Sequence, residues 1–244
     1  MTTPFKSAPE DQDCPNALSW REGDMPYSEE FGDFYYSRAD GRAESRHVFI
    51  DGNRLPERLE NASRFTVAEL GFGTGLNFLE TWDTWERTAP EGSELTFHSF
   101  ELNLLDAPTI RRALSVWPDL QERIDCMLED WPDSIHDDVA LAFAAGTKTT
   151  RLFVHRGYAH EALPRLDARA DAWFLDGFAP SRNPEMWSAD LLKAVATKTA
   201  DGGTFATYSA AGWVRRNLEA AGFMVEKRPG HAGKRDMTIG RLAA

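Results

Sequence analysis

Several features that define common protein classes are missing from this 244-residue sequence. It has only two cysteines, Cys14 and Cys126, which lie far apart with no further Cys or His at metal-ligand spacing. This argues against a disulfide framework and against a zinc site. No apolar run approaches the roughly 18 to 20 residues that span a bilayer, and the N-terminus lacks the basic and apolar parts of a signal peptide. We therefore expect a cytoplasmic protein with no membrane partner.

Positive charge is also scarce. The chain has 27 Lys and Arg against 39 Asp and Glu, a net charge of −12. This balance opposes nucleic-acid binding over most of the surface, because phosphate neutralisation by Lys and Arg dominates that affinity. The basic residues gather toward the C-terminal end, where residues 182–244 hold ten Lys and Arg against six Asp and Glu. Charge alone leaves open both a local basic binding surface and an ordinary solvated one.

Short apolar segments alternate with amphipathic ones along most of the chain. We expect strands at 65–70, 95–101, 172–176, 204–208 and 223–227, and helices at 76–87, 107–116, 184–199 and 211–221. This alternation predicts βαβ units around a parallel sheet. Two apolar strands at 139–143 and 150–155, joined by a Gly-containing turn, predict an inserted β-hairpin. We expect an N-terminal extension, residues 1–60, packed on one compact domain, residues 61–244.

Three alternate glycines follow the strand at 65–70 and precede the helix at 76–87. Glycine lets the backbone turn sharply and lets a ligand approach the main chain, and a helix N-terminus offers unpaired N–H groups. Dinucleotide enzymes usually have G-x-G-x-x-G at this place. Gly-x-Gly-x-Gly after an acidic residue instead resembles the first motif of S-adenosylmethionine methyltransferases, although a dinucleotide site and a purely structural turn remain alternatives. In the methyltransferase interpretation the cofactor contacts are Glu69, Gly71, Gly73, Gly75 and Asn77.

Two further strands end in a carboxylate. Glu101 ends the strand at 95–101, where a carboxylate can accept hydrogen bonds from both ribose hydroxyls of a nucleoside. Asp176 ends the strand at 172–176, and a loop rich in Gly and Pro follows it with two aromatic residues, Phe178 and Trp187. Open α/β sheets bind ligands at this edge. The plain alternatives are a solvated glutamate at position 101 and a packing role for each aromatic residue.

The segment from Leu175 to Trp187 closely resembles the methyltransferase domain of the bacterial tRNA-modifying enzymes MnmC and their stand-alone relatives, called MnmD. The resemblance runs from about Pro26 to Gly240 and also includes the glycine loop, Phe31–Ser37, Val48–Asn53, Gly203–Thr207, Val214–Arg216 and Lys234–Met237. It implies a Rossmann-like class I S-adenosylmethionine methyltransferase, with helices on both faces of a seven-stranded, mostly parallel sheet. No second glycine-rich nucleotide motif follows, so the stand-alone form is expected, without a flavin oxidase domain and without FAD.

The resemblance also implies a reaction and its site. The enzymes methylate the primary amine of 5-aminomethyluridine, or of its 2-thio form, at the wobble position of tRNA. The amine attacks the sulfonium methyl of S-adenosyl-L-methionine, and S-adenosyl-L-homocysteine leaves. An alkylamine with a pKa of roughly 10 must lose a proton before it attacks, and Asp176 is the expected catalytic group that orients it and helps remove that proton. Asp176 is also expected among the residues that contact the cofactor. No metal is needed. The partner is the tRNA anticodon loop. The protein residues expected to contact its base are Phe178, Pro180, Asn183 and Trp187, and those expected to contact its phosphates are Arg182, Arg215, Arg216, Lys234 and Arg235.

The sequence departs from the family pattern at two positions near the cofactor. Gly157-Tyr158 stands where the family usually has Gly-Asp, and Leu102 follows Glu101 where a lysine is common. We therefore expect Gly157 and Tyr158 to contact the adenine through the backbone or the tyrosine ring. Two other functions remain open: methylation of a small-molecule amine or hydroxyl, and RNA binding by an inactive protein that kept the fold.

Overall fold

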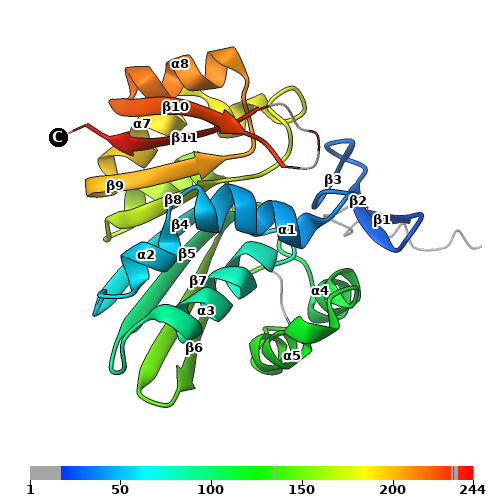
Figure 1. Ribbon diagram of the computed structural model, residues 1–244. Helices are drawn as coiled ribbons and strands as arrows, with labels where there is room; N and C mark the ends of the chain where they lie inside the picture. Colours follow the sequence, from blue (N-terminus) through cyan, green and yellow to red (C-terminus); the bar gives the residue numbers. More distant parts are fainter. Residues whose placement is uncertain (1–17, 134–135, 232, 234–235, 244) are drawn as a thin grey trace, which may run out of the picture.

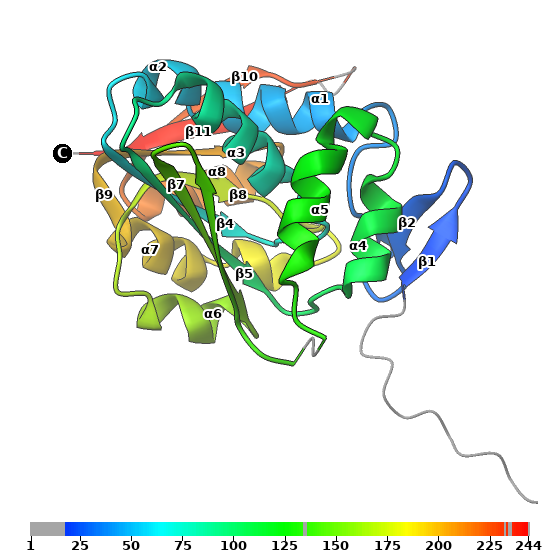
Figure 2. The ribbon, with the colours of Figure 1, turned by 90° about the horizontal axis from the view of Figure 1, so that it is seen from below.

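The computed structural model describes residues 18–133, 136–231, 233 and 236–243. Its centre is an eight-stranded sheet in the order β10-β11-β9-β8-β4-β5-β7-β6, with helices on both faces (Figures 1 and 2). The strands are β4 (Arg64–Leu70), β5 (Glu94–Glu101), β6 (Val139–Ala145), β7 (Lys148–Arg156), β8 (Ala170–Leu175), β9 (Thr199–Thr207), β10 (Phe223–Pro229) and β11 (Asp236–Leu242). Neighbouring strands from β9 to β7 are all parallel. The expected Rossmann-like α/β sheet is confirmed.

The sheet has one strand more than the seven that the resemblance implies, and both arms of the predicted hairpin belong to it. β7 runs parallel to β5, and β6 pairs with it antiparallel, with Val139 opposite Val154 and Ala145 opposite Lys148. The inner arm of the hairpin is thus part of the central sheet, and β6 forms its edge.

Two predictions of secondary structure need correction. β11 was not expected, and it enters the sheet antiparallel between β9 and β10. The single helix expected at 184–199 is divided into a 3₁₀ turn, η4 (Pro184–Trp187), and α7 (Ala189–Thr197). Ser188 lies between them in an extended conformation, and its hydroxyl accepts a hydrogen bond from the Leu191 amide. A serine N-cap starts a new helix because it satisfies an amide that has no intrahelical partner.

The remaining helices divide between the two faces of the sheet (Figure 2). They are α1 (Gly41–Ser45), the π-helical η1 (Arg46–Asp51), α2 (Leu55–Leu59), α3 (Leu76–Thr88), α4 (Ala107–Leu114), η2 (Pro118–Leu120), α5 (Gln121–Glu129), α6 (Ala159–Ala162), η3 (Leu163–Arg165) and α8 (Gly212–Ala220). None of them within the described ranges is long and apolar enough to cross a membrane.

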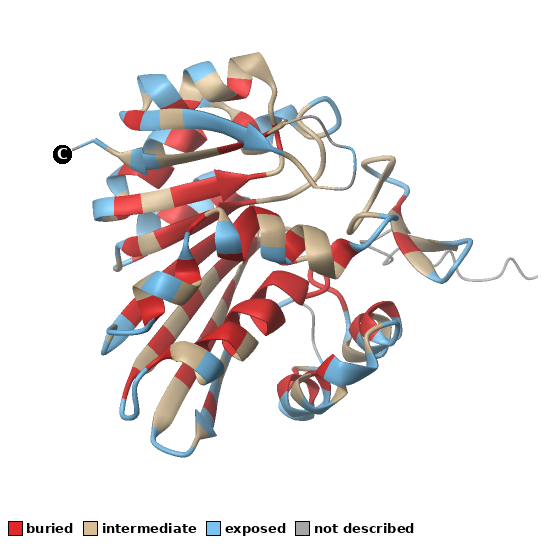
Figure 3. Ribbon diagram, viewed as in Figure 1, coloured by how far each residue is buried: buried red, intermediate tan, exposed pale blue. Residues whose placement is uncertain are grey.

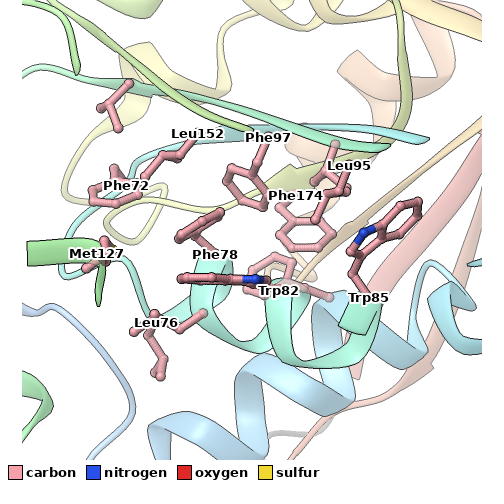
Figure 4. Packing of buried hydrophobic residues seen from close by; sticks show 14 of the residues in the cluster. Phe72, Leu76, Phe78, Trp82, Trp85, Leu95, Phe97, Met127, Leu152 and Phe174 are labelled. Atoms are coloured by element: carbon pink, nitrogen blue, oxygen red, sulfur yellow. The ribbon is translucent and has the colours of Figure 1, made fainter. Parts of the chain in front are cut away.

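Each face of the sheet has its own hydrophobic cluster. Buried residues occur along the central strands and on the helices that cover them (Figure 3). In Figure 4, Phe78 of α3 points from the helix toward Phe97 of the sheet, and Phe174 lies beside Phe97. The rings of Phe78 and Phe97 meet edge to face, with centroids 5.4 Å apart. Aromatic side chains bury large apolar areas, so this packing fixes α3, and with it the glycine loop that precedes it.

The N-terminal residues form a small antiparallel sheet of β1 (Leu18–Arg21), β2 (Met25–Ser28) and β3 (Asp33–Phe34) at the carboxyl edge of the parallel strands (Figure 1). The Arg112 guanidinium of α4 lies 3.9 Å from the centroid of the Trp20 ring. The Tyr36 hydroxyl donates a hydrogen bond to the Ala113 carbonyl at 2.7 Å. These contacts hold the small sheet against α4. The boundary proposed at residue 60 stays a prediction.

Candidate functional site

A cavity of about 480 Å³ lies at the carboxyl edge of the parallel strands. The loops after β4, β5, β7 and β8 form one side of it, and residues 30–38, which we call the N-terminal wall, form the other. Of the site residues predicted from the sequence, those lining the cavity are Gly71, Gly73, Asn77, Glu101, Gly157, Tyr158, Asp176, Phe178 and Asn183. Four strand ends that are distant in the sequence therefore meet at one place.

The glycine loop needs glycine for its conformation. Gly71, Gly73 and Gly75 have φ angles of +85°, +53° and +80°, a region that other residues enter only with strain. A Cβ atom on Gly71 would lie 3.1 Å from the Gly177 Cα. The reason is the register of the sheet: Leu70 of β4 pairs with Leu175 of β8, so the two following loops leave the sheet side by side. The glycine loop and the loop that carries Asp176 thus touch backbone to backbone.

Glu101 is fixed by backbone amides at the end of β5. Its Oε2 accepts a hydrogen bond from the Gly73 amide at 2.9 Å, and its Oε1 accepts one from the Asn103 amide at 2.8 Å. Burial raises the pKa of the Glu101 carboxyl above its ordinary value, although these amides act in the other direction. A carboxylate has about four acceptor positions, so an oriented Glu101 can still accept hydroxyl donors from the cavity.

Glu69, Asn77 and Asp176 form a hydrogen-bonded network beside Glu101. The Asn77 Nδ2 atom lies 2.8 Å from Glu69 Oε1 and 2.8 Å from Asp176 Oδ2. The Ser99 hydroxyl donates to Glu69 Oε2 at 2.7 Å. Burial, together with the negative charge of Asp176, raises the pKa of Glu69 well above its ordinary value. Glu69 is completely buried and does not line the cavity, whereas Asn77 and Asp176 do.

The loop after β8 is joined to the N-terminal wall. The rings of Phe178 and Phe31 are stacked with centroids 4.6 Å apart, and Tyr35 meets Phe178 edge to face at 5.4 Å. Asp33 Oδ2 accepts a hydrogen bond from the Ala179 amide at 3.1 Å. These contacts place Phe178 in the wall of the cavity, next to Asp176.

Trp187 has a different position from Phe178. Its side chain is buried, and its indole N–H donates to the Phe178 carbonyl at 3.2 Å. Trp187 therefore supports the loop from within the protein, and Phe178 is the member of the pair that a ligand can reach. The Tyr208 hydroxyl supports the same loop by donating to the Gly177 carbonyl at 2.8 Å. Burial raises the pKa of Tyr208 well above its ordinary value, with the charge of Asp176 adding to the effect.

The other predicted site residues lie outside the cavity lining. Arg182 and Arg216 are exposed, and Arg215 is half-buried on α8. The structure also leaves Gly75 and Pro180 outside the lining, and Lys234 and Arg235 lie outside the described residues. Tyr158 lines the cavity with its side chain half-exposed, and its ring centroid is 5.4 Å from that of His160.

Several lining residues were not predicted, and most belong to the N-terminal wall or to α1. They include Glu30, Phe31, Asp33, Tyr35, Glu44 and Ser45. The signal that could have identified the wall is its aromatic content, since Phe31, Phe34, Tyr35 and Tyr36 fall within six residues of an otherwise polar segment. No comparable signal precedes Glu44 and Ser45, which reach the cavity through the packing of α1.

Known proteins with similar sequences agree with this geometry. A profile of the family described as S-adenosyl-L-methionine-dependent methyltransferase matches residues 118–243. The tRNA 5-methylaminomethyl-2-thiouridine biosynthesis bifunctional protein MnmC of Chromohalobacter salexigens is 44% identical over 237 residues, which are 95% of this chain and 34% of the relative. MnmC of Pseudomonas aeruginosa PAO1 is 46% identical over 227 residues, which are 91% of this chain and 34% of the relative. The chain thus spans about a third of the length of these relatives.

A solved structure shows the same fold. MNMC2 from Aquifex aeolicus superposes with a TM-score of 0.76 at 24% identity, over 96% of this chain and 72% of that one. The resemblance to MnmC that the sequence motifs indicated is confirmed. The cavity combines a loop whose glycines have positive φ angles, a carboxylate at the end of β5 and a carboxylate after β8. The family profile covers more than half of the chain. The chain belongs to the family of S-adenosyl-L-methionine-dependent methyltransferases.

Proposed function

We propose that this chain transfers the methyl group of S-adenosyl-L-methionine to the primary amine of 5-aminomethyluridine, or its 2-thio form, at the wobble position of tRNA. The observation that carries the proposal is that Asp176 lines the same cavity as the glycine loop and Glu101, beside the ring of Phe178. The MnmC relatives, whose names specify biosynthesis of the methylaminomethyl nucleoside, support the choice of substrate.

The residues present fit the cofactor. Glu101 offers acceptors suited to ribose hydroxyls, and Gly71 and Gly73 present main chain without a side chain to the cavity. The carboxylates that line the cavity are Glu30, Asp33, Glu44, Glu101, Asp176 and Glu185, with Arg38 as the lining arginine. A cavity of this charge favours a cationic ligand. When bound, the cofactor supplies an electrophilic methyl group on a positively charged sulfonium.

Asp176 then acts on the substrate amine. A primary alkylamine is mostly protonated at neutral pH, and the ammonium form cannot attack. The Asp176 carboxylate accepts a hydrogen bond from the amine, orients its lone pair and helps remove the proton. Phe178 and Phe31 provide an apolar wall that excludes water beside this group. The displacement requires neither a metal nor a flavin, because the protein's main task is to position the two reactants.

The tRNA anticodon loop is the proposed partner, and we place the reaction in the cytoplasm, where tRNA is found. The Phe178 ring is available for stacking on the wobble uracil, since bases of RNA loops are commonly recognised by aromatic side chains. Arg182, Arg215 and Arg216 are the proposed phosphate contacts on the described surface. Because the rest of the chain is acidic, RNA binding should be modest and should weaken as salt concentration rises.

Nucleoside mass spectrometry tests the function directly. Purified protein with S-adenosyl-L-methionine should convert 5-aminomethyluridine in tRNA to its methylaminomethyl form, and tRNA from cells lacking the protein should retain the unmethylated nucleoside. Free aminomethyluridine and small alkylamines serve as controls. Methylation of a small amine at a rate equal to that of tRNA would show that the substrate class is wrong.

Asp176→Asn gives the matching test of mechanism. The variant keeps the size of the side chain but removes the charge that favours proton transfer. Orienting and general-base groups contribute about 10² to 10⁴-fold, so the single-turnover rate should fall by at least about 100-fold. Cofactor affinity, measured by calorimetry, should stay close to wild type. A rate within a few-fold of wild type would assign Asp176 a structural role.

A further inference from the structure

We propose that Asn77 is a positioning residue for Asp176, and that Glu69 acts by holding Asn77 rather than by contacting the cofactor. The proposal rests on the proposed function, because it takes Asp176 to be the group that meets the substrate amine. It also changes the role of Glu69, which the sequence places beside the glycine loop and therefore suggests as a cofactor ligand.

The orientation of the Asn77 amide follows from its partners. Two carboxylate oxygens, Glu69 Oε1 and Asp176 Oδ2, each lie 2.8 Å from the same Asn77 atom. The Asp176 carboxylate oxygen accepts hydrogen bonds, and Glu69 Oε1 accepts one either as a carboxylate oxygen or as the carbonyl oxygen of a carboxylic acid. The Asn77 atom is therefore assigned as the NH₂ group, with one hydrogen for each partner. The amide oxygen then faces the Ser45 hydroxyl, which donates to it at 2.5 Å. Asn77 thus uses both ends of its amide, and neither end can exchange without losing hydrogen bonds.

The network is anchored in several elements of the protein. Glu69 ends β4, Ser99 lies on β5, Asn77 is in the first turn of α3, and Ser45 ends α1. All four side chains are at least nine-tenths buried. Hydrogen bonds in such a low-dielectric interior are strong when every partner is satisfied, and they hold side chains in one arrangement. Asp176, by contrast, follows the end of β8 on a loop.

Glu69 itself has no access to the cavity. Its exposed fraction is 0%, and both of its carboxylate oxygens accept hydrogen bonds from within the protein, from Asn77 and from the Ser99 hydroxyl. A cofactor ligand needs at least one oxygen directed into the cavity. Asn77 extends from this network into the cavity lining and contacts Asp176 there.

The consequence for the reaction concerns the direction of the Asp176 carboxylate. A hydrogen bond to Oδ2 fixes the rotation of the group, so its lone pairs have a set direction before the substrate arrives. Pre-set geometry of this kind contributes strongly to catalysis, since a displacement of about 1 Å can reduce the rate roughly 100-fold. The network thereby compensates for the position of Asp176 on a loop.

A double-mutant cycle tests whether Asn77 acts through Asp176. Asn77→Ala should lower the single-turnover rate about 10- to 100-fold, while cofactor affinity, measured by calorimetry, changes by less than about threefold. In the Asp176→Asn background the same substitution should lower the rate by less than about threefold, because the carboxylate it positions is already absent. Independent, multiplicative losses would overturn the proposal, and so would a large loss of cofactor affinity in Asn77→Ala.

Two substitutions at Glu69 test its role separately. Glu69→Gln keeps the size of the side chain and an oxygen for Asn77, whereas Glu69→Leu has a similar volume and no acceptor. The rate should fall in Glu69→Leu about as far as in Asn77→Ala, and Glu69→Gln should restore most of it. Cofactor affinity should be unchanged in Glu69→Gln. A loss of roughly tenfold or more, as expected when a charged hydrogen bond to a ligand is removed, would show that Glu69 contacts the cofactor.

The network can also be tested without methyl transfer. If wild-type protein does not methylate tRNA, the proposed function fails, but the contact between Asn77 and Asp176 still predicts coupled effects on thermal unfolding. The decrease in Tm for the double variant Asn77→Ala, Asp176→Ala should be smaller than the sum of the two single decreases, since each substitution removes the same hydrogen bond. Additive decreases would overturn the positioning contact itself.

Discussion

Gly71→Ala tests the backbone contact on which the site depends. The substitution adds one methyl group to a residue whose φ angle is +85°, and the new Cβ would lie 3.1 Å from the Cα and 3.2 Å from the nitrogen of Gly177. The left-handed conformation costs a non-glycine residue about 1 to 2 kcal/mol. The atoms that the new Cβ would meet belong to the backbone of Gly177, so no side-chain rotation can relieve the contact, and overpacking adds about 1 to 3 kcal/mol. The free energy of unfolding should therefore fall by about 2 to 5 kcal/mol.

Gly92→Ala provides the matched control. Gly92 has a φ angle of +75°, but no atom lies within 4 Å of the position that its Cβ would take. Its substitution should cost only the conformational part, about 1 to 2 kcal/mol. The difference between the two variants isolates the contact between the two loops.

Urea unfolding and cofactor calorimetry measure both consequences. Gly71→Ala should be less stable than Gly92→Ala and should also bind S-adenosyl-L-methionine more weakly, because the shifted loops carry Asp176 and the amides that orient Glu101. Gly92→Ala should bind normally. Equal stability of the two variants would refute the reasoning, since it would mean that the loops after β4 and β8 are not in close contact.

Three other predictions concern charge. Glu101→Ala should weaken cofactor binding by roughly 10- to 150-fold. Because burial raises the pKa of Glu101, acidification should weaken cofactor binding to the wild type at a higher pH than an ordinary glutamate would allow, whereas binding to Glu101→Gln should not change with pH in this range; calorimetry measures both. Burial beside His155 lowers the pKa of His98 from 6.5 to about 4, so about 3 kcal/mol of stability present above pH 6.5 should be lost as pH falls toward 4, and urea unfolding of His98→Phe should lack this loss. Charge reversal at Arg215 and Arg216 should raise the KM for tRNA and flatten its salt dependence with unchanged cofactor affinity, whereas an unchanged salt slope would place RNA elsewhere.

The positions of Gly71, Glu101 and Asp176 could be predicted because each depends on local sequence and strand polarity. Each residue ends or follows an apolar strand, and parallel strands end at the same edge of a sheet, so the three had to meet. The side of the strand that a residue faces is less evident. Glu69 precedes the glycine loop by two positions, but the structure directs it into the interior, where Ser99 and Asn77 receive it.

Features that depend on contacts between distant segments could not be predicted in the same way. β11 is half-exposed and lacks a regular alternation of apolar residues, and it becomes a strand because it pairs on both sides with β9 and β10. The helix expected at 184–199 is divided because Ser188 acts as an N-cap. That role depends on the position of η4, whose Trp187 indole donates a hydrogen bond to the Phe178 carbonyl. The N-terminal wall reads as a polar loop until its aromatic rings meet the loop after β8.

The hydrogen bond between Asp33 and the Ala179 amide joins residues 146 positions apart, which has a consequence for the order in which the protein is made. At about 5 to 20 residues per second, a ribosome needs roughly 7 to 30 s between these two residues. During that time Phe31 and Tyr35 have been synthesised but the Phe178 ring has not, so these aromatic side chains cannot yet take their final neighbours. The cavity is therefore completed late, after the glycine loop, β5 and the hairpin have been synthesised. A nascent chain released before Phe178 would contain most of the proposed cofactor contacts, but its N-terminal wall would lack the ring against which Phe31 and Tyr35 pack.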